Sequence, residues 1–138
     1  MKELKQRSTC PISTALDVLG DKWTLLIVRD MVFAGKSTYG QFLQSEEKMA
    51  TNILADRLAG LEAQGIVSKA VAADKKSKFT YRLTEKGVAI VPILVELILW
   101  SATYCTTIVN PGLLAELQTG KDAAVEKYQR LACEKTLA

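Results

Sequence analysis

Histidine is absent from the 138-residue sequence, and cysteine is scarce. Without histidine the chain lacks the commonest general base, the usual partner of a serine or cysteine nucleophile, and the commonest metal ligand. Its three cysteines, Cys10, Cys105 and Cys133, do not have zinc-ligand spacing. Gly-rich loops of the dinucleotide or P-loop type are missing too. These absences predict a protein that is not an enzyme and holds no cofactor and no metal.

Signals for export and membrane insertion are also missing from the sequence. The polar N-terminus, 1–7, is not followed by an apolar stretch, so no secretory signal is predicted. The most apolar stretch, 88–100, contains Pro92 and Glu96 and is shorter than the roughly 20 residues that a bilayer requires. An odd number of separated cysteines is typical of reduced thiols. The sequence therefore predicts a soluble cytoplasmic protein with no membrane partner.

Positive charge is modest overall but locally concentrated. The net charge is +3, and 49% hydrophobic and 24% charged residues indicate one globular domain, 1–138. Between residues 69 and 82, Asp74 is the only acidic residue among five basic ones: Lys69, Lys75, Lys76, Lys78 and Arg82. A cluster of basic residues of this kind is typical of a surface that binds phosphates.

Helical signals dominate the first half of the chain. A short helix is predicted over 13–19, with Ser13 as N-cap and Gly20 as its stop. Asp21 is a second N-cap, for a helix over 22–32 that Gly35 ends. A short extended connection, 36–38, leads to a helix over 39–44 and a polar turn.

The best-marked helix covers 50–64. Its buried stripe is predicted to be Leu54, Leu58 and Leu61, and Gly65 is its stop. The period then changes to two, which predicts strands over 66–71 and 78–83 joined by a polar turn, 72–77. Together the strands form a β-hairpin with a basic tip.

Thr84 is expected to cap a long helix over 85–110 that bends at Pro92, followed by helices over 113–118 and 121–135. Two short helices, a hairpin and a long helix, in this order, predict a winged helix-turn-helix. The fold class is therefore α+β, mostly helical, with a β-hairpin wing, a long dimerisation helix and C-terminal helices.

The outward face of the 50–64 helix is small and polar, which suits close approach to base edges in the major groove. Asn52 could pair with adenine and Asp56 could accept from a cytosine amino group, while Arg57 could reach a phosphate or form an internal ion pair. A solvated helix face explains this pattern alone, but the basic hairpin beside it favours DNA. The predicted DNA-binding residues are Lys36, Ser37, Thr38, Thr51, Asn52, Ala55, Asp56, Arg57, Lys75, Lys76 and Lys78.

Several blocks in a fixed order resemble the HxlR family of bacterial regulators, which are relatives of the MarR group. They are Cys10-Pro11, Ala15-Leu16, 19–27 (LGDKWTLLI), 49–58 (MATNILADRL), 61–67 (LEAQGIV), 81–87 (YRLTEKG) and Leu99-Trp100. The resemblance covers 10–104 and leaves 105–138 as a C-terminal extension. It implies a homodimeric repressor or activator on double-stranded DNA with a pseudo-palindromic operator. One departure is the turn 72–77, which is short of the prolines and acidic residues common in the family's wing.

The stretch 88–100 is apolar almost all round, which predicts burial on every side and therefore a partner subunit. The predicted dimer interface consists of Val91, Leu94, Val95, Ile98 and Trp100; the alternative is burial by the C-terminal helices of the same subunit.

Two features of the sequence concern the signal to which a regulator of this kind would respond. The family resemblance suggests Cys10 as a redox sensor, and nearby basic residues would favour its thiolate; an inert interface residue is the alternative. A small-molecule effector near Trp23 is a further possibility. The alternative functions are a winged-helix protein-interaction module and a thiol oxidoreductase, and the latter would need a cofactor site or a nearby resolving cysteine.

Overall fold

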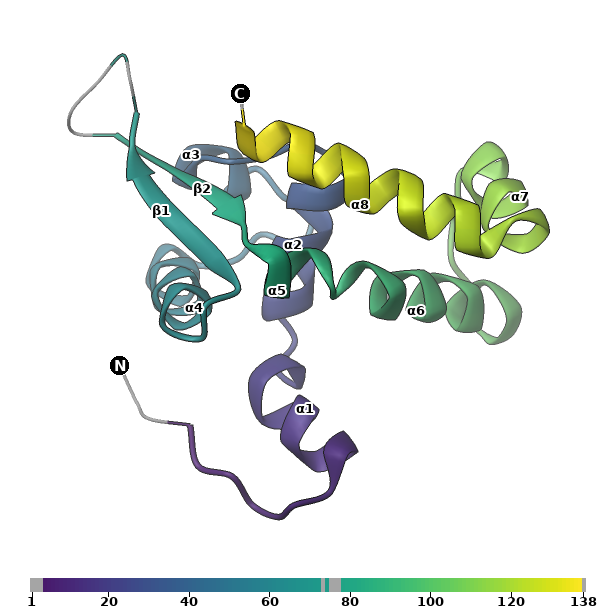
Figure 1. Cartoon of the computed structure of the whole chain (residues 1–138), viewed down its shortest axis with the longest axis horizontal. Coiled ribbons are helices and arrows are strands. Elements are labelled where there is room, and N and C mark those ends of the chain that lie inside the picture. Colours follow the sequence, from purple (N-terminus) through teal and green to yellow (C-terminus); the bar gives the residue numbers. More distant parts are fainter. Residues whose placement is uncertain (1–3, 73, 75–77, 138) are drawn as a thin grey trace.

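The computed structural model describes residues 4–72, 74 and 78–137 (Figure 1). The elements in order are α1 (Pro11–Leu19), α2 (Thr24–Phe33), α3 (Tyr39–Phe42), α4 (Thr51–Ala63), β1 (Val67–Val71), β2 (Phe79–Leu83), α5 (Glu85–Val88), α6 (Val91–Tyr104), α7 (Pro111–Thr119) and α8 (Lys121–Leu137). The mostly helical α+β class with a two-stranded hairpin is confirmed. In Figure 1, α4 and the hairpin lie on one side of α2, and α6 and α8 run side by side on the other.

The start of the first helix differs from the prediction. It begins at Pro11, with Cys10 in the N-cap position, so Ser13 lies inside the helix and is not its cap. Proline fits this first position because its missing N–H has no helical partner there in any case. The described residues of α1 include no fully buried side chain, and only its last residues, Val18 and Leu19, pack against the core.

The caps of the next helices follow the sequence more closely. The N-cap position of α2 is Trp23 and not the predicted Asp21, but the Asp21 carboxylate accepts from the backbone N–H groups of Trp23 (2.9 Å) and Thr24 (3.0 Å) at the start of the helix. Gly35 and Gly65 follow α2 and α4 with φ of 65° and 72°, a left-handed conformation that glycine adopts without strain. Leu54, Leu58 and Leu61 are buried as predicted.

The hairpin pairs antiparallel, from Val67 opposite Leu83 to Val71 opposite Phe79. The extended segment before α3 lies against its edge, because the Tyr81 N–H donates to the Ser37 carbonyl at 2.7 Å. The Thr84 hydroxyl caps the next helix by accepting from the Gly87 N–H at 3.2 Å. A Cβ at Gly87 would lie 2.3 Å from the Ile66 carbonyl oxygen, so only glycine fits at this crossing.

The predicted long helix over 85–110 is two helices, and the prediction of a single bent one is wrong. The chain breaks between α5 and α6, where Pro92 occupies the first turn of α6, and α6 ends at Tyr104. Taken together, Glu85–Tyr104 has 20 residues and a mean hydropathy of 1.8 over its most apolar window, enough to cross a membrane by length and composition. Its inner face is packed within the subunit, since Val91 and Val95 are 0% exposed.

The C-terminal helices complete the core. Leu117 of α7 and Ala124 and Ala132 of α8 join the buried cluster. The rings of Phe33 and Tyr128 meet edge to face, with centroids 5.0 Å apart. The Gln129 side-chain amide donates to the Val88 carbonyl at 3.3 Å. The extension after Cys105 therefore covers one side of α2 and α6 with packed side chains.

Candidate nucleic-acid interface

The outward surface of α4 is small and polar, and we call it the reading face. All its members are exposed: Thr51, Asn52, Ala55, Asp56, Ala59 and Ala63. With 13 residues, α4 is about 20 Å long at 1.5 Å per residue. Ala50 precedes it and has no side chain that could cap the first N–H groups. The N-terminus of α4 thus keeps the free donors and the positive dipole end that attract phosphate.

Behind the reading face, α3 holds the start of α4 in place. The Tyr39 hydroxyl donates to the Thr51 carbonyl at 2.9 Å. Thr38 and Gln41 form a capping box at the start of α3, in which the Thr38 hydroxyl accepts from the Gln41 N–H at 3.3 Å. Ser37 and Thr38, predicted as DNA contacts, lie half-buried at this position. The Thr38 hydroxyl serves the helix cap, a role that sequence reasoning did not assign to it.

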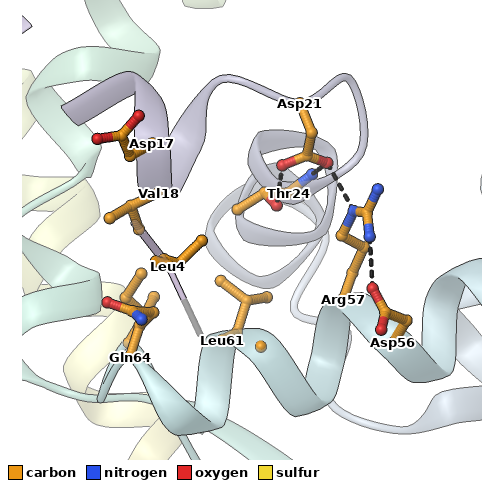
Figure 2. A pocket seen from close by; sticks show the side chains of 11 residues that line it. Leu4, Asp17, Val18, Asp21, Thr24, Asp56, Arg57, Leu61 and Gln64 are labelled. Carbon is orange, nitrogen blue, oxygen red and sulfur yellow. Dashed lines mark hydrogen bonds and ion pairs between the residues drawn. The ribbon is translucent and has the colours of Figure 1, made fainter. Parts of the chain in front are cut away.

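Asp21, Arg57 and Asp56 form a chain of charges between α2 and the reading face (Figure 2). The Arg57 Nε donates to Asp21 at 2.9 Å, and its Nη1 donates to Asp56 at 2.5 Å. Of the two roles expected for Arg57, the structure contains the internal ion pair. Asp21 and Arg57 are 36 positions apart in the sequence, so no local pattern could predict their contact.

The hydrogen bonds in this chain of charges shift two pKa values in opposite directions. Burial raises the pKa of Asp21, but hydrogen bonds from the Thr24 hydroxyl, two backbone N–H groups and Arg57 outweigh it, so the pKa lies below its usual value. The bond to Asp21 raises the pKa of Arg57. Both groups are therefore charged at neutral pH.

A cavity of about 450 Å³ opens beside this chain of charges, between α1, α2 and α4. Figure 2 shows Val18 and Leu61 on opposite sides of it, with Leu4 of the N-terminal segment between them. The segment is tied to α1 because the Arg7 Nε donates to Asp17 at 2.6 Å. The cavity therefore lies beside the second half of α4, where Leu61 is part of its lining.

A second polar cluster joins α2 to the turn between α3 and α4. Asp30 is buried on α2 and accepts from the Lys36 ammonium at 3.3 Å and from the Ser45 hydroxyl. Arg29 donates to Asp30 at 3.0 Å and, through both terminal nitrogens, to Glu47 at 2.6 and 2.9 Å. The bond to Arg29 lowers the pKa of Glu47 to about 2.

Lys36 is therefore paired with Asp30 inside the subunit, and its role as a DNA contact stays a prediction. A buried carboxylate needs a cation and hydrogen bonds, and Lys36 supplies both to Asp30. Sequence reasoning missed Asp30, Ser45 and Glu47. The available signal was an acidic residue in the otherwise apolar run 25–33, next to Arg29.

The hairpin carries exposed basic side chains toward its tip. Lys78 is exposed, and the Lys69 ammonium lies 4.0 Å from the centre of the Phe79 ring. Lys75 and Lys76, predicted as phosphate contacts, lie outside the described residues. No cluster of three or more His, Cys, Asp or Glu side chains that could hold a metal occurs in residues 4–72, 74 and 78–137.

The predicted dimer-interface residues of α6 differ in their burial. Val91, Leu94 and Val95 are buried against the C-terminal helices and α2 of the same subunit, so these three cannot supply interface surface. Trp100 is 61% exposed and Ile98 is half-buried. A different stripe on α6 faces outward, and we call it the outer stripe: Ile93, Leu97, Trp100 and Tyr104.

Cys10 is exposed at the N-cap position of α1, the helix that also exposes Ile12 and Leu16. Cys105 and Cys133 are exposed elsewhere on the surface.

Comparison with known proteins places this geometry in a family. A family model described as HxlR-like helix-turn-helix matches residues 18–109. The chain is 35% identical over 86 residues to the HTH-type transcriptional regulator sll1512 of Synechocystis, covering 62% of this chain and 63% of that relative, just under two thirds of its length.

Solved structures agree with this placement. PA1607, described as a candidate transcription factor, is 40% identical with a TM-score of 0.65, covering 77% of this chain and 70% of that one. The redox regulator HypR in its oxidised form is 30% identical with a TM-score of 0.62, covering 71% and 100%.

Proposed function

The chain belongs to the HxlR-like helix-turn-helix family, and on that premise we propose that it is a sequence-specific DNA-binding transcriptional regulator. It acts in the cytoplasm as a homodimer on a pseudo-palindromic operator, and it is a regulator and not an enzyme. The observation that carries this proposal is the reading face of α4, which is exposed along its length and joined to the start of α2 by the Arg57–Asp21 contact. A helix of this kind fits the major groove.

The roles of the reading face follow from its side chains. Asn52 presents an amide that can make two hydrogen bonds to adenine, while Ala55 and Ala59 allow the helix to approach base edges. The free N–H groups at Thr51 and the exposed Lys78 of the hairpin bind phosphates on either side. Phosphate contacts set the position of the protein, and Asn52 supplies part of the sequence preference.

Dimerisation is supported by the apolar surface that one subunit leaves uncovered. The outer stripe of α6 and the exposed Ile12 and Leu16 of α1 form surface of the kind that a second copy buries. A twofold dimer would place two α4 helices about 34 Å apart, one turn of DNA. The redox response that we propose for the protein is assigned to the exposed Cys10 beside this surface.

The test is a fluorescence anisotropy titration with duplexes from upstream of the protein's own gene, at several salt concentrations. Asn52→Ala should weaken binding to the preferred duplex by about 1–3 kcal/mol and leave binding to scrambled DNA unchanged. Gln118→Ala, which removes an exposed amide from α7, is the matched control and should have no effect.

Lys78→Ala should instead weaken binding to both duplexes and reduce the salt slope by about one. Lys127→Ala on α8 is its control. Absence of binding at low salt would contradict the proposal and favour a winged-helix protein-interaction module. For Cys10, peroxide should reduce operator binding by the wild type and not by Cys10→Ser; equal loss in both would exclude this thiol.

A further inference from the structure

The reading face carries a negative charge, although it is the surface that would approach DNA. Asp56 is its only ionisable member, and the Asp56 side chain is 56% exposed. Asp56 follows Asn52 by four residues, so the two side chains lie one turn apart on the same side of α4. DNA phosphates repel a carboxylate at this position unless a cation beside it offsets the charge.

Arg57 supplies that cation and also holds the carboxylate in place. Its Nη1 donates to Oδ2 of Asp56 at 2.5 Å, while its Nε donates to Asp21 at 2.9 Å (Figure 2). Asp21 is itself held at the start of α2 by the N–H groups of Trp23 and Thr24. Because the guanidinium is planar, anchoring its Nε fixes the direction in which Nη1 points. The Asp56 carboxylate is therefore positioned from a second helix.

The other oxygen of Asp56 remains available to DNA. Within residues 4–72, 74 and 78–137, Oδ1 of Asp56 accepts no hydrogen bond. An ionised carboxylate only accepts hydrogen bonds, so this oxygen needs a donor on a base edge. The exocyclic amino groups of cytosine and adenine are the donors in the major groove, whereas guanine and thymine present acceptors there.

The two amino groups differ in their neighbours. Cytosine presents its N4 amino group as its only polar group in the major groove, while adenine presents its N6 amino group next to the acceptor N7. The N7 lone pair repels a carboxylate, but it suits an amide such as that of Asn52, which donates and accepts. Cytosine is therefore the better partner for Asp56.

We propose that Asp56 reads a cytosine amino group in each half-site, and that Arg57 is the positioning residue that holds the carboxylate for this contact and offsets its charge. Arg57 thus contributes to specificity without touching a base. The preference at this base pair depends on the contact between α2 and α4 through Asp21. This assignment rests on the proposed function, because it gives a base to one residue of the reading face.

The preference is measured by selecting bound duplexes from a random-sequence library with the full-length protein and sequencing them. The wild type should recover a cytosine at a fixed position in each half-site. Asp56→Asn should change this cytosine to adenine, because an amide can bind N6 and N7 together, and should leave the other positions unchanged. Glu126→Gln removes the same charge from an exposed position on α8 and should recover the wild-type motif.

Arg57→Lys tests the positioning role. Lysine keeps the positive charge but lacks the planar fork of donors that joins Asp21 to Asp56. The preference for cytosine should fall roughly tenfold at this position, while the preference at the position that Asn52→Ala relaxes should remain. A residue that only stabilised the fold would weaken binding to all duplexes equally and leave the motif as it is.

A modified base tests the contact at the level of single atoms. N4-methylcytosine still pairs with guanine, but a methyl group replaces the amino hydrogen that faces the major groove. At the selected cytosine this base should weaken wild-type binding roughly tenfold, the effect of one hydrogen bond to a charged group. Binding by Asp56→Ala should change little, because this variant makes no such bond.

A motif that Asp56→Asn leaves unchanged would overturn the reading role, and an adenine at this position with the wild type would overturn the choice of cytosine. An Arg57→Lys motif identical to that of the wild type would overturn the positioning role. In each of these cases the proposed function stands, since a motif is recovered. A wild type that selects no motif would contradict the proposed function and this assignment together.

Discussion

Asp21 precedes α2 and Asp30 lies near its C-terminal end, and each carboxylate binds cations. Asp21 binds Arg57 of α4, whereas Asp30 binds Arg29 and Lys36. Their surroundings differ: the Asp30 side chain is 8% exposed and that of Asp21 is 29% exposed. Asp30 has three side-chain donors around it, Arg29, Lys36 and Ser45. Asp21 shares Arg57 with Asp56 on the reading face. The buried carboxylate therefore holds three donors of its own, and the half-buried one shares its arginine with a second carboxylate.

The sharpest test of this difference is Asp30→Ala. The substitution leaves Lys36 and Arg29 without their shared anion in a largely buried site, so the free energy of unfolding should fall by about 3 kcal/mol. Urea denaturation measures this loss. Asp74→Ala, at an exposed position in the hairpin turn, is the control and should change stability by less than about 0.5 kcal/mol. Similar losses in the two variants would contradict a structural role for Asp30.

Asp21→Ala should cost less, about 1–2 kcal/mol, because it removes a helix cap in a half-exposed site. Asp21→Asn keeps one oxygen acceptor for the Trp23 and Thr24 N–H groups but loses the charge opposite Arg57 and the second oxygen, which accepts from the Thr24 hydroxyl. Its cost should therefore be about 0.2–1 kcal/mol, that of a solvent-accessible ion pair. If asparagine is as damaging as alanine in urea denaturation, the ion pair outweighs the cap.

Acid should act on the Arg29–Glu47 pair. The pKa of Glu47 is lowered to about 2 from the ordinary 4.5, so its contribution is present above pH 4.5 and is lost as the pH falls toward 2. Unfolding by urea is compared at one pH above 4.5 and one between 4.5 and 2. Glu47→Gln should lose less stability across this interval than the wild type. Identical losses would show that the pair contributes nothing in solution.

The smallest effect is expected for Asp56→Asn. The Asp56 side chain is 56% exposed, so removing its charge should change the free energy of unfolding by less than about 0.5 kcal/mol. Thermal unfolding beside the wild type measures this. A larger loss would mean that Asp56, and not Asp21, anchors Arg57, which would reverse the comparison between the two ends of α2.

The sequence predicted the elements that have local signals. The stripe of Leu54, Leu58 and Leu61 and the left-handed Gly65 define α4 within one stretch of chain. Thr84 was identified as a cap because its partner, the Gly87 N–H, is only three residues away. Ser13 was misplaced as a cap because two competing start signals, Pro11 and Ser13, lie within three residues, and proline at the first position decides the start.

The sequence could not predict which side of α6 faces the core. A helix that is apolar almost all round shows no periodicity, so nothing in 88–100 distinguishes the inward Val91 from the outward Trp100. The C-terminal helices make that choice by covering one side of α6.

The sequence by itself determined the order of the elements, the inner face of α4 and the absence of histidine chemistry, because these depend on residues within a few turns or on composition. Only the tertiary structure decided that Arg57 pairs with Asp21, that Lys36 serves Asp30, and that Arg29 binds Glu47. Contacts of this kind depend on side-chain positions that packing sets between distant segments, and a one-dimensional pattern does not carry them.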